Sequence, residues 1–381
     1  MTFTTLWIAP REQYGNTTAI RLRLRVYNYE GMPMATLKDV ARVAGVSRST
    51  ASYVYNNPER VGRTTRLRVE AAARQLGFAG PDPMGRLLRA GKVNAIGVIA
   101  PGVFNMAGMF TGYFPRVLAG IAEICDEFGA NLTLVSGLAE DKTFGIRNAL
   151  VNGFILSPPH DDELIGSVEF RKLPFAVIDT DGRADVNSVN VDARSGCRTA
   201  AQHLLDLGHR RFAIMSFLRD LGPPVVHPPK RGRKLEVAGL PLDQQKLLGY
   251  ADALTGVGIN IDDVPIIQAH PWDRSAAAFL LSQFRSATAV LAMADMQALS
   301  VIEEARRRGL NVPSDISVVG FNNIPEAAAA NLTTIDSNGA EKGRVAARLV
   351  FSAGQVRHQI LPTLLVVRGT TAAARPHEHV T

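Results

Sequence analysis

The sequence predicts an α/β protein in which a small N-terminal module of three helices precedes a larger two-lobed domain built on parallel sheets. Residues 36–77 carry apolar residues at helical spacing in three short segments. From Ala95 onward, short apolar segments alternate with longer helical stretches, as in parallel strands joined by helices. The ten strands expected in this way exceed what one open sheet comfortably holds, so we expect two α/β lobes.

The first helix is expected to open at Thr36, where Asp39 three residues later completes a capping-box pattern. Gly45 breaks this helix, and Ser47 caps a second helix that runs to about Asn56. A helix, a short turn containing glycine and a second helix form a helix-turn-helix unit.

A third helix is expected to open at Thr64 or Thr65 and to close with Gly77 as its C-cap. Beyond it, we predict strands at Ala95–Ala100, Leu132–Val135, Gly153–Leu156, Phe175–Asp179, Ser188–Val191, Phe212–Met215, Ile266–Gln268, Ala289–Met293, Ser317–Gly320 and Leu332–Ile335. Helices fit residues 114–129, 194–207, 242–257, 274–284, 295–308 and 338–353.

The domain organisation follows from these elements. Residues 1–33 are expected to be a poorly ordered extension, with translation hypothesised to begin at Met32 or Met34. The proline-rich, basic residues 218–241 are expected to form a mobile surface loop within the large domain. The remaining parts are a helix-turn-helix domain, a linker, the two-lobed domain and a tail, at 34–80, 81–92, 93–372 and 373–381.

Composition narrows the class of protein. The 381 residues are 46% hydrophobic and 20% charged, as in a globular protein with two or three folding units. The sequence shows no apolar run of the roughly 18 residues that a membrane span needs and no secretory signal, so a cytoplasmic location is expected. Its two cysteines, Cys125 and Cys197, are far apart, and we expect neither a disulfide framework nor a metal or other cofactor.

Positive charge is concentrated near the N-terminus. Residues 34–91 contain ten Lys or Arg and four Asp or Glu, a net charge of +6, whereas residues 92–381 have a net charge of −1. A compact basic module on a near-neutral body is typical of a protein that neutralises nucleic-acid phosphates.

The stretch TLKDVARVAGVSRSTASYVYNN, residues 36–57, closely resembles the DNA-binding module of the lactose-repressor (LacI/GalR) family. The resemblance continues through residues 69–78, 189–215, 312–323 and 332–336, to about Thr371. It implies a transcriptional repressor that binds operator DNA as a homodimer. It also implies an effector domain that resembles periplasmic sugar-binding proteins and holds a small molecule, a sugar or a derivative, between its lobes.

In this family the second helix lies in the major groove and its N-terminal side chains touch base edges. The resemblance thus implies DNA contacts by Thr36, Arg48, Ser49, Thr50, Ser52, Tyr53 and Asn56. We favour base reading over phosphate contact for Arg48, and phosphate contact or packing for Thr50. Tyr53 replaces the family's usual arginine, so no operator sequence is predicted.

The family's linker folds into a hinge helix on the operator, and a leucine wedges into a minor-groove step. Alignment of residues 86–91 makes that leucine Leu88, with Leu87 as the alternative. Pro83 and Gly85 replace the usual alanines, which we expect to raise the cost of ordering the linker.

Matching residues to the family also implies an effector site at the carboxyl ends of the parallel strands. Its candidates are Tyr113, Phe114, Asp179, Lys246, Trp272 and Asp295. Lys246 replaces the usual arginine and so loses its planar fork. The alternatives are core packing for Phe114 and Trp272, and helix capping for Asp179 and Asp295.

The alternatives to a DNA-binding repressor are an enzyme and a sugar-binding receptor. An enzyme, such as a carbohydrate-active one, is disfavoured because no nucleophile, phosphate-loop or metal-ligand motif stands out. A sugar-binding receptor would match the two lobes but would not carry residues 36–57.

Overall fold

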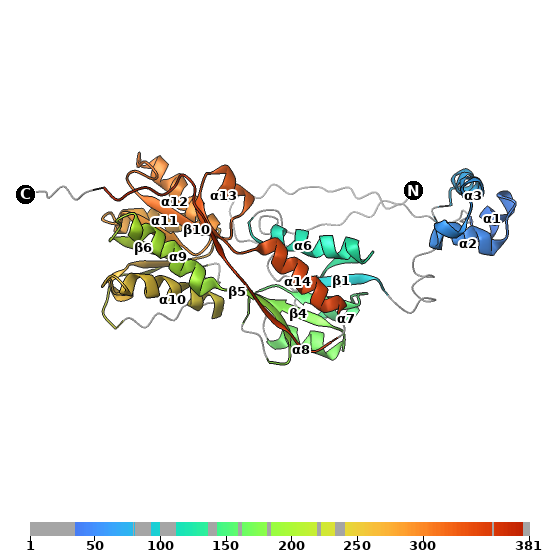
Figure 1. Ribbon diagram of the computed structural model, residues 1–381, viewed down its shortest axis with the longest axis horizontal. Helices are drawn as coiled ribbons and strands as arrows, with labels where there is room; N and C mark the ends of the chain where they lie inside the picture. Colours follow the sequence, from blue (N-terminus) through green and yellow to red (C-terminus); the bar gives the residue numbers. More distant parts are fainter. Residues whose placement is uncertain are drawn as a thin grey trace, which may run out of the picture. The chain divides into compact units, whose positions relative to one another are not determined.

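The computed structural model describes residues 35–78, 80, 93–99, 112–135, 143–158, 162–180, 184–218, 222–232, 241–352 and 354–375. The chain divides into two compact units, which we call the head, residues 1–92, and the body, residues 93–381 (Figure 1). The expected extension, most of the tail and the linker with Leu87 and Leu88 lie outside the described residues.

The head contains the three predicted helices, α1 (Leu37–Val43), α2 (Arg48–Asn56) and α3 (Arg63–Leu76), with a 3-10 turn, η1, at Pro58–Arg60. Thr36 and Asp39 form both bonds of the predicted capping box. Gly77 ends α3 in the left-handed region at φ 63°, which a glycine adopts without strain. The predicted start of α3 was wrong by one or two residues, because the helix begins at Arg63 without a side-chain cap.

Small apolar side chains let the three helices of the head pack closely. The buried set is Val40, Ala41, Ala44, Ala51, Val54, Val69, Ala72 and Ala73. Because this core uses one side of each helix, the other sides, including the N-terminal turn of α2, remain at the surface.

The body contains two sheets, as expected. The first has six parallel strands in the order β12-β5-β4-β3-β1-β2, namely His358–Leu361, Asn187–Val191, Phe175–Ile178, Gly153–Leu156, Ala95–Ile99 and Asn131–Val135. The second has seven in the order β13-β11-β10-β9-β6-β8-β7, namely Leu364–Val366, Thr333–Asp336, Ser317–Phe321, Ala289–Ala292, Phe212–Phe217, Ile266–Ala269 and Val225–His227. Only its edge strands β13 and β7 pair antiparallel.

Helices cover both faces of each sheet. In the first lobe, α6 (Phe114–Glu127) and α14 (Gly339–Phe351) pack on one face, and α8 (Asp162–Phe170) packs on the other. In the second lobe, α9 and α10 cover one face while α11 and α12 cover the other, at Ala193–Asp206, Pro241–Thr255, Ser275–Gln283 and Asp295–Arg307. The short helices α7 and α13 are Phe144–Asn148 and Pro325–Ala329, and η2 is Ile261–Asp263.

The two lobes are interwoven along the chain. Helix α14 and strand β12 follow all strands of the second lobe except β13 in sequence, but they complete the first lobe (Figure 1). The chain therefore crosses between the lobes before α14, at residues 336–338, so these residues lie where the lobes meet.

The structure corrects part of the prediction for residues 218–241, of which 219–221 and 233–240 lie outside the described residues. We expected a mobile loop, but Val225–His227 form β7, which pairs with β8 at the sheet edge. Its three residues lie between prolines and are too few to show alternation. The predicted strands also omitted β12 and β13, and the predicted helices omitted the short α7, α8 and α13.

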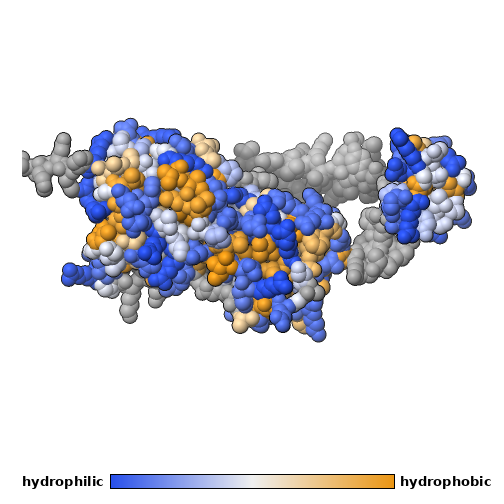
Figure 2. Space-filling model, viewed as in Figure 1, coloured by the Kyte–Doolittle hydropathy of each residue, from blue (hydrophilic) through white to orange (hydrophobic). Residues whose placement is uncertain are grey.

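The surface of the body carries separate apolar patches, while the head shows a mainly hydrophilic face in the same view (Figure 2). Exposed apolar side chains include Phe170, Ile360 and Phe128. No helix within the described ranges is both long and apolar enough to span a bilayer.

Glycines allow α6 and α14 to approach closely. A methyl group on Gly120 of α6 would collide with the carbonyl of Ala340, and one on Gly343 of α14 would collide with the carbonyl of Val117. Gly166 of α8 has open space around it instead.

We therefore expect Gly343→Ala to destabilise the body by about 1–3 kcal/mol, because α14 must move away from α6. Gly166→Ala is the matched control and should be neutral or stabilising by up to about 1 kcal/mol, since alanine favours a helix interior. Urea unfolding of the full chain measures both changes. Equal effects of the two substitutions would contradict the close-contact explanation.

Candidate DNA-binding surface and effector site

The N-terminal turn of α2 presents polar side chains at the surface of the head. Ser47 caps the helix by accepting a hydrogen bond from the Thr50 amide at 3.0 Å. Its hydroxyl also lies 2.8 Å from the hydroxyls of Ser49 and Thr50. The cap fixes where α2 begins, and Arg48 and Ser49 lie on its exposed first turn.

Arg48 forms no ion pair with another described residue, so its guanidinium is available to a ligand outside the chain. Tyr53 lies about one turn further along α2 and is 43% exposed, while Ser52 and Thr50 are half-buried. Asn56 is the last residue of α2. The Thr36 hydroxyl is occupied by the capping box, because it donates to the Asp39 carboxylate at 2.7 Å.

In the body, a buried ion pair lies at the carboxyl end of β4. Asp179 follows that strand with a left-handed backbone (φ 54°), which aspartate adopts more readily than most residues. It pairs with Lys342 of α14, whose residue is 1% exposed. The Tyr113 hydroxyl donates to the other Asp179 oxygen at 2.9 Å, and the Tyr113 ring lies 4.8 Å from the ammonium.

Burial acts on the protonation of this group of side chains. It lowers the pKa of the Lys342 ammonium, and the Asp179 carboxylate opposes that effect. Burial and the same carboxylate together hold the pKa of the Tyr113 hydroxyl well above its usual value. Tyr113 therefore remains a hydrogen-bond donor, and Asp179 is occupied rather than serving as a helix cap.

Arg116, one turn into α6, connects the first lobe to the second. Its guanidinium donates to the backbone carbonyls of Asn322 and Asn323 at 2.8 and 2.7 Å and lies 3.4 Å from the Asp336 carboxylate. Both asparagines follow β10 with positive φ angles of 113° and 52°. We call the region formed by Tyr113, Arg116, Asp179, Lys342 and these second-lobe groups the interlobe junction.

Lys246 approaches the carboxyl end of β9 from α10. Its ammonium donates to the Met293 carbonyl at 3.0 Å and lies 4.7 and 4.3 Å from the ring centroids of Phe217 and Phe321. It is close enough to Lys342 that its charge lowers the pKa of that lysine. Lys246 therefore lies near the carboxyl end of β9, close to the interlobe junction.

Asp295 is already engaged by the second lobe. Its carboxylate accepts hydrogen bonds from the Thr334 hydroxyl at 2.5 Å and from the Ile324 amide at 2.9 Å. These bonds connect the start of α12 to β11 and to the segment after β10. Burial is the largest influence on this carboxyl and raises its pKa to about 6.

The two aromatic candidates occupy different surroundings. Phe114 is buried in the core between α6 and the first sheet. Trp272 is half-buried, and a Cβ atom on Gly112 of the first lobe would lie 3.5 Å from its indole ring. Its indole therefore lies where the two lobes meet.

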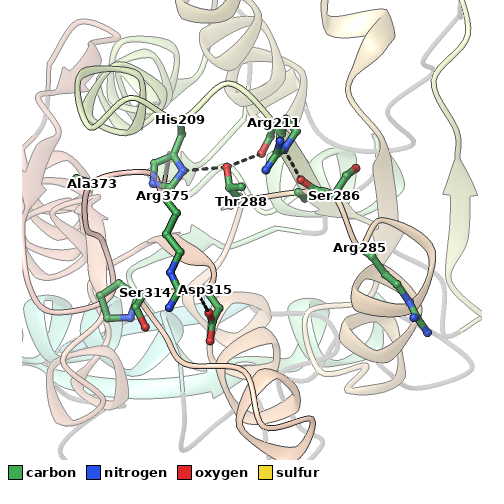
Figure 3. Close-up of a pocket in the computed structure, with 11 residues that line it drawn as sticks. His209, Arg211, Arg285, Ser286, Thr288, Ser314, Asp315, Ala373 and Arg375 are labelled. Carbon is green, nitrogen blue, oxygen red and sulfur yellow. Dashed lines mark hydrogen bonds and ion pairs between the residues drawn. The ribbon is translucent and has the colours of Figure 1, made fainter. Parts of the chain in front are cut away.

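A cavity of about 260 Å³ lies elsewhere, at the amino ends of β6, β9 and β10 (Figure 3). His209 bonds to Thr288 there, and Arg375 pairs with Asp315 at 2.7 Å. Arg211 donates to the Ser286 carbonyl. Most of its polar groups are therefore already paired, and its place is opposite to the edge expected for an effector.

Sequence reasoning missed Arg116, Lys342 and the two asparagines. One signal was available, because Lys342 interrupts the apolar spacing of α14 formed by Gly339, Gly343, Ala346, Ala347 and Val350. A lysine at a core position needs a partner. Neither the identity of Asp179 as that partner nor the reach of Arg116 across the lobes is visible in local spacing.

Within the described ranges, no three His, Cys, Asp or Glu side chains are grouped to hold a metal ion. Cys125 and Cys197 are both buried free thiols. Burial raises the pKa of Cys197 to about 12, so it is a poor thiolate nucleophile.

Two family models match the chain, "Bacterial regulatory proteins, lacI family" at residues 36–80 and "Periplasmic binding protein-like domain" at 201–371. The transcriptional regulator Rv3575c of Mycobacterium tuberculosis is 33% identical over 89% of this chain and 97% of its own length. The transcriptional repressor CytR of Escherichia coli is 30% identical with the same coverage. The lac repressor dimer bound to operator and the anti-inducer ONPF is 26% identical, with a TM-score of 0.69 over 90% of this chain and 100% of that one.

The raised pKa of Asp295 predicts how the stability of the protein changes with pH. The folded state favours the protonated carboxyl, so this group's contribution to stability is greatest below about pH 4 and is lost as the pH rises through about 6. Asp295→Asn removes the titration, and the Thr334 hydroxyl can turn to accept from the new amide. The variant should gain stability relative to the parent by up to roughly 3 kcal/mol between about pH 4 and 7. Urea unfolding across this range measures the difference, and a pH-independent difference would contradict the assignment.

Proposed function

Because the chain belongs to the lacI family of bacterial regulatory proteins, we propose that it is a repressor whose operator affinity is controlled by a small molecule. The effector, a sugar or a sugar derivative, binds at the interlobe junction. CytR and the lac repressor, both similar over most of this chain, support the choice of repressor. Their similarity also supports a homodimer on a two-fold operator.

The N-terminal turn of α2 carries the proposal for DNA binding. Arg48 is exposed and free of ion pairs with the described residues, as a base-reading side chain must be before it meets DNA. Arginine can donate two parallel hydrogen bonds to guanine in the major groove. Ser49, Ser52 and Tyr53 extend this surface. Thr36, Thr50 and Asn56 are proposed to contact the phosphate backbone of the DNA on either side of it.

The linker completes the DNA-binding part of the proposal. Leu88 is proposed to wedge into the central minor-groove step, as the family resemblance implies. Because Pro83 and Gly85 disfavour a helix there, ordering the linker costs free energy, and operator binding depends strongly on the state of the body.

In the body, Tyr113, Asp179, Lys246, Trp272 and Asp295 are proposed to shape the effector site. Tyr113, Asp179 and Lys246 lie at the carboxyl ends of parallel strands, where ligands of such folds bind. The indole of Trp272 is proposed to stack on the ligand. Phe114, in the core, and Asp295, bonded to the Ile324 amide, are proposed to hold the surrounding elements in place. A ligand that changes the contacts of Arg116 with the second lobe changes operator affinity by about 5- to 150-fold.

We propose no enzymatic activity, since the relatives reported are transcriptional regulators. A regulator of this kind acts on chromosomal DNA, so we place the protein in the cytoplasm. A sugar receptor without a DNA role is the second candidate, and an operator selected from random duplexes by the full chain would exclude it.

On that selected operator, Arg48→Ala should reduce discrimination against a scrambled duplex by about 1–3 kcal/mol, because a base contact is lost. Arg74→Ala, which removes the same charge from α3, should leave the discrimination unchanged. Fluorescence anisotropy titrations at a fixed salt concentration give both values. If Arg48→Ala weakens both duplexes equally, Arg48 contacts phosphate instead.

A further inference from the structure

Lys246 is a buried cation that forms no ion pair with a carboxylate of the described residues. The residue is 3% exposed, and among the described residues its ammonium contacts one backbone carbonyl and two aromatic rings. An ammonium has three donors, so Lys246 retains hydrogen-bonding capacity and positive charge. Burying such a charge is costly unless a ligand compensates it.

Two further donors without partners lie on the neighbouring strands. Ser216 of β6 and Gln268 of β8 are directly paired in the sheet register, so their side chains share one face. They are 0% and 3% exposed, and neither the Ser216 hydroxyl nor the Gln268 amide nitrogen has a hydrogen-bond partner in the part of the chain that the structure describes. Alternation along β6 and β8 places both on the face covered by α10, which carries Lys246.

Strand β7 fixes which end of the Gln268 amide is free. The His227 Nε2 atom lies 2.7 Å from the Gln268 Oε1 atom. When that nitrogen donates, the oxygen is satisfied and the amide N–H groups remain as donors. His227 belongs to residues 218–241, so this segment orients a side chain of the second lobe.

One unpartnered acceptor lies at the same edge. Gln297, on the first turn of α12, donates to the carbonyls of Ser216 and Ala269 at 2.9 and 3.2 Å. Its Oε1 atom has no hydrogen-bond partner among the described residues, although Gln297 is 1% exposed. Lys246, Ser216 and Gln268 supply three donor groups, and Gln297 supplies one acceptor, near the carboxyl ends of the second sheet's strands. This set matches a molecule that carries anionic oxygens and at least one hydroxyl.

We propose that Lys246, Ser216 and Gln268 form a subsite for a carboxylate or phosphate group, so that the effector is an acidic metabolite rather than a neutral sugar. The Lys246 ammonium supplies the charge, and the two neutral donors supply direction. Gln297 accepts a hydroxyl of the same molecule, and His227 is a positioning residue for Gln268. This proposal rests on the proposed effector-controlled function and narrows the class of its ligand.

The test uses the full chain and matched pairs of compounds: glucose with gluconate and with glucose 6-phosphate, ribose with ribose 5-phosphate, and adenosine with its monophosphate. Melting temperature is measured with each compound, followed by calorimetry of any that bind. We expect only acidic members to raise the melting temperature and to change operator affinity.

Three variants locate the acidic compound. Lys246→Met and Gln268→Glu should each weaken its binding by about 30-fold or more, because they remove the cation or place a carboxylate against the anion. Gln268→Glu retains an oxygen for His227. Ser216→Ala should weaken binding about 5-fold, through the loss of one neutral donor. Lys230→Met, which removes an exposed lysine beside β7, is the control and should leave binding unchanged.

The alternatives separate clearly. A neutral compound that binds, changes operator affinity and is unaffected by Lys246→Met overturns the acidic subsite but leaves the proposed function in place. If no acidic compound binds, the subsite is also overturned. A chain that selects no operator contradicts the proposed function itself. If a variant melts at a lower temperature than the parent in the absence of compound, the substitution has caused a folding defect. In that case Lys246→Arg, which keeps the positive charge, tests the subsite, and it should still bind the acidic compound.

Discussion

The buried ion pair between Asp179 and Lys342 is the interaction on which the body depends most. Taking an ammonium out of water is costly, and the ion pair with the Asp179 carboxylate offsets part of that cost. Asp179 follows a central strand of the first sheet, whereas Lys342 lies on α14, which comes after all strands of the second sheet except β13. The pair therefore requires α14 to be seated on the first lobe, where Gly120 and Gly343 already permit close packing with α6.

The need to compensate a buried charge also applies to the other charged side chains near the interlobe junction. Lys342 has Asp179, Arg116 has carbonyls of the second lobe, and Asp295 is satisfied by Thr334 and Ile324. Within the described ranges, the Lys246 ammonium contacts a carbonyl and two aromatic rings but no carboxylate. A compound that supplies the missing negative charge would bind next to groups that connect the lobes. The proposed ligand site would therefore be coupled to lobe position through direct contacts.

The sequence predicted the main elements well because they depend on local rules. The capping box at Thr36, the left-handed Gly77 and the apolar strands of the body all follow from short-range patterns. It did not predict β7, because that strand is three residues long and is defined by its partner β8. Edge strands of this kind are specified by tertiary pairing more than by propensity.

Site residues were harder to predict for the same physical reason. Asp179 and Lys342 are 163 positions apart, and Arg116 is 206 positions from Asn322, so no periodicity connects them. The resemblance to known repressors supplied Tyr113, Asp179 and Lys246, but it could not supply Lys342. Asp295 was a candidate for the effector site, and within the fold its carboxylate accepts a hydrogen bond from the Thr334 hydroxyl.

A double-mutant cycle on the buried pair tests this account most directly. Urea unfolding of the full chain is measured for the parent, Lys342→Met, Asp179→Asn and the double variant. Each single change should cost about 3–5 kcal/mol, because it leaves one charge buried alone, and the double variant should cost clearly less than their sum. Additive losses, or single changes that cost nothing, would show that Asp179 and Lys342 do not hold α14 in place.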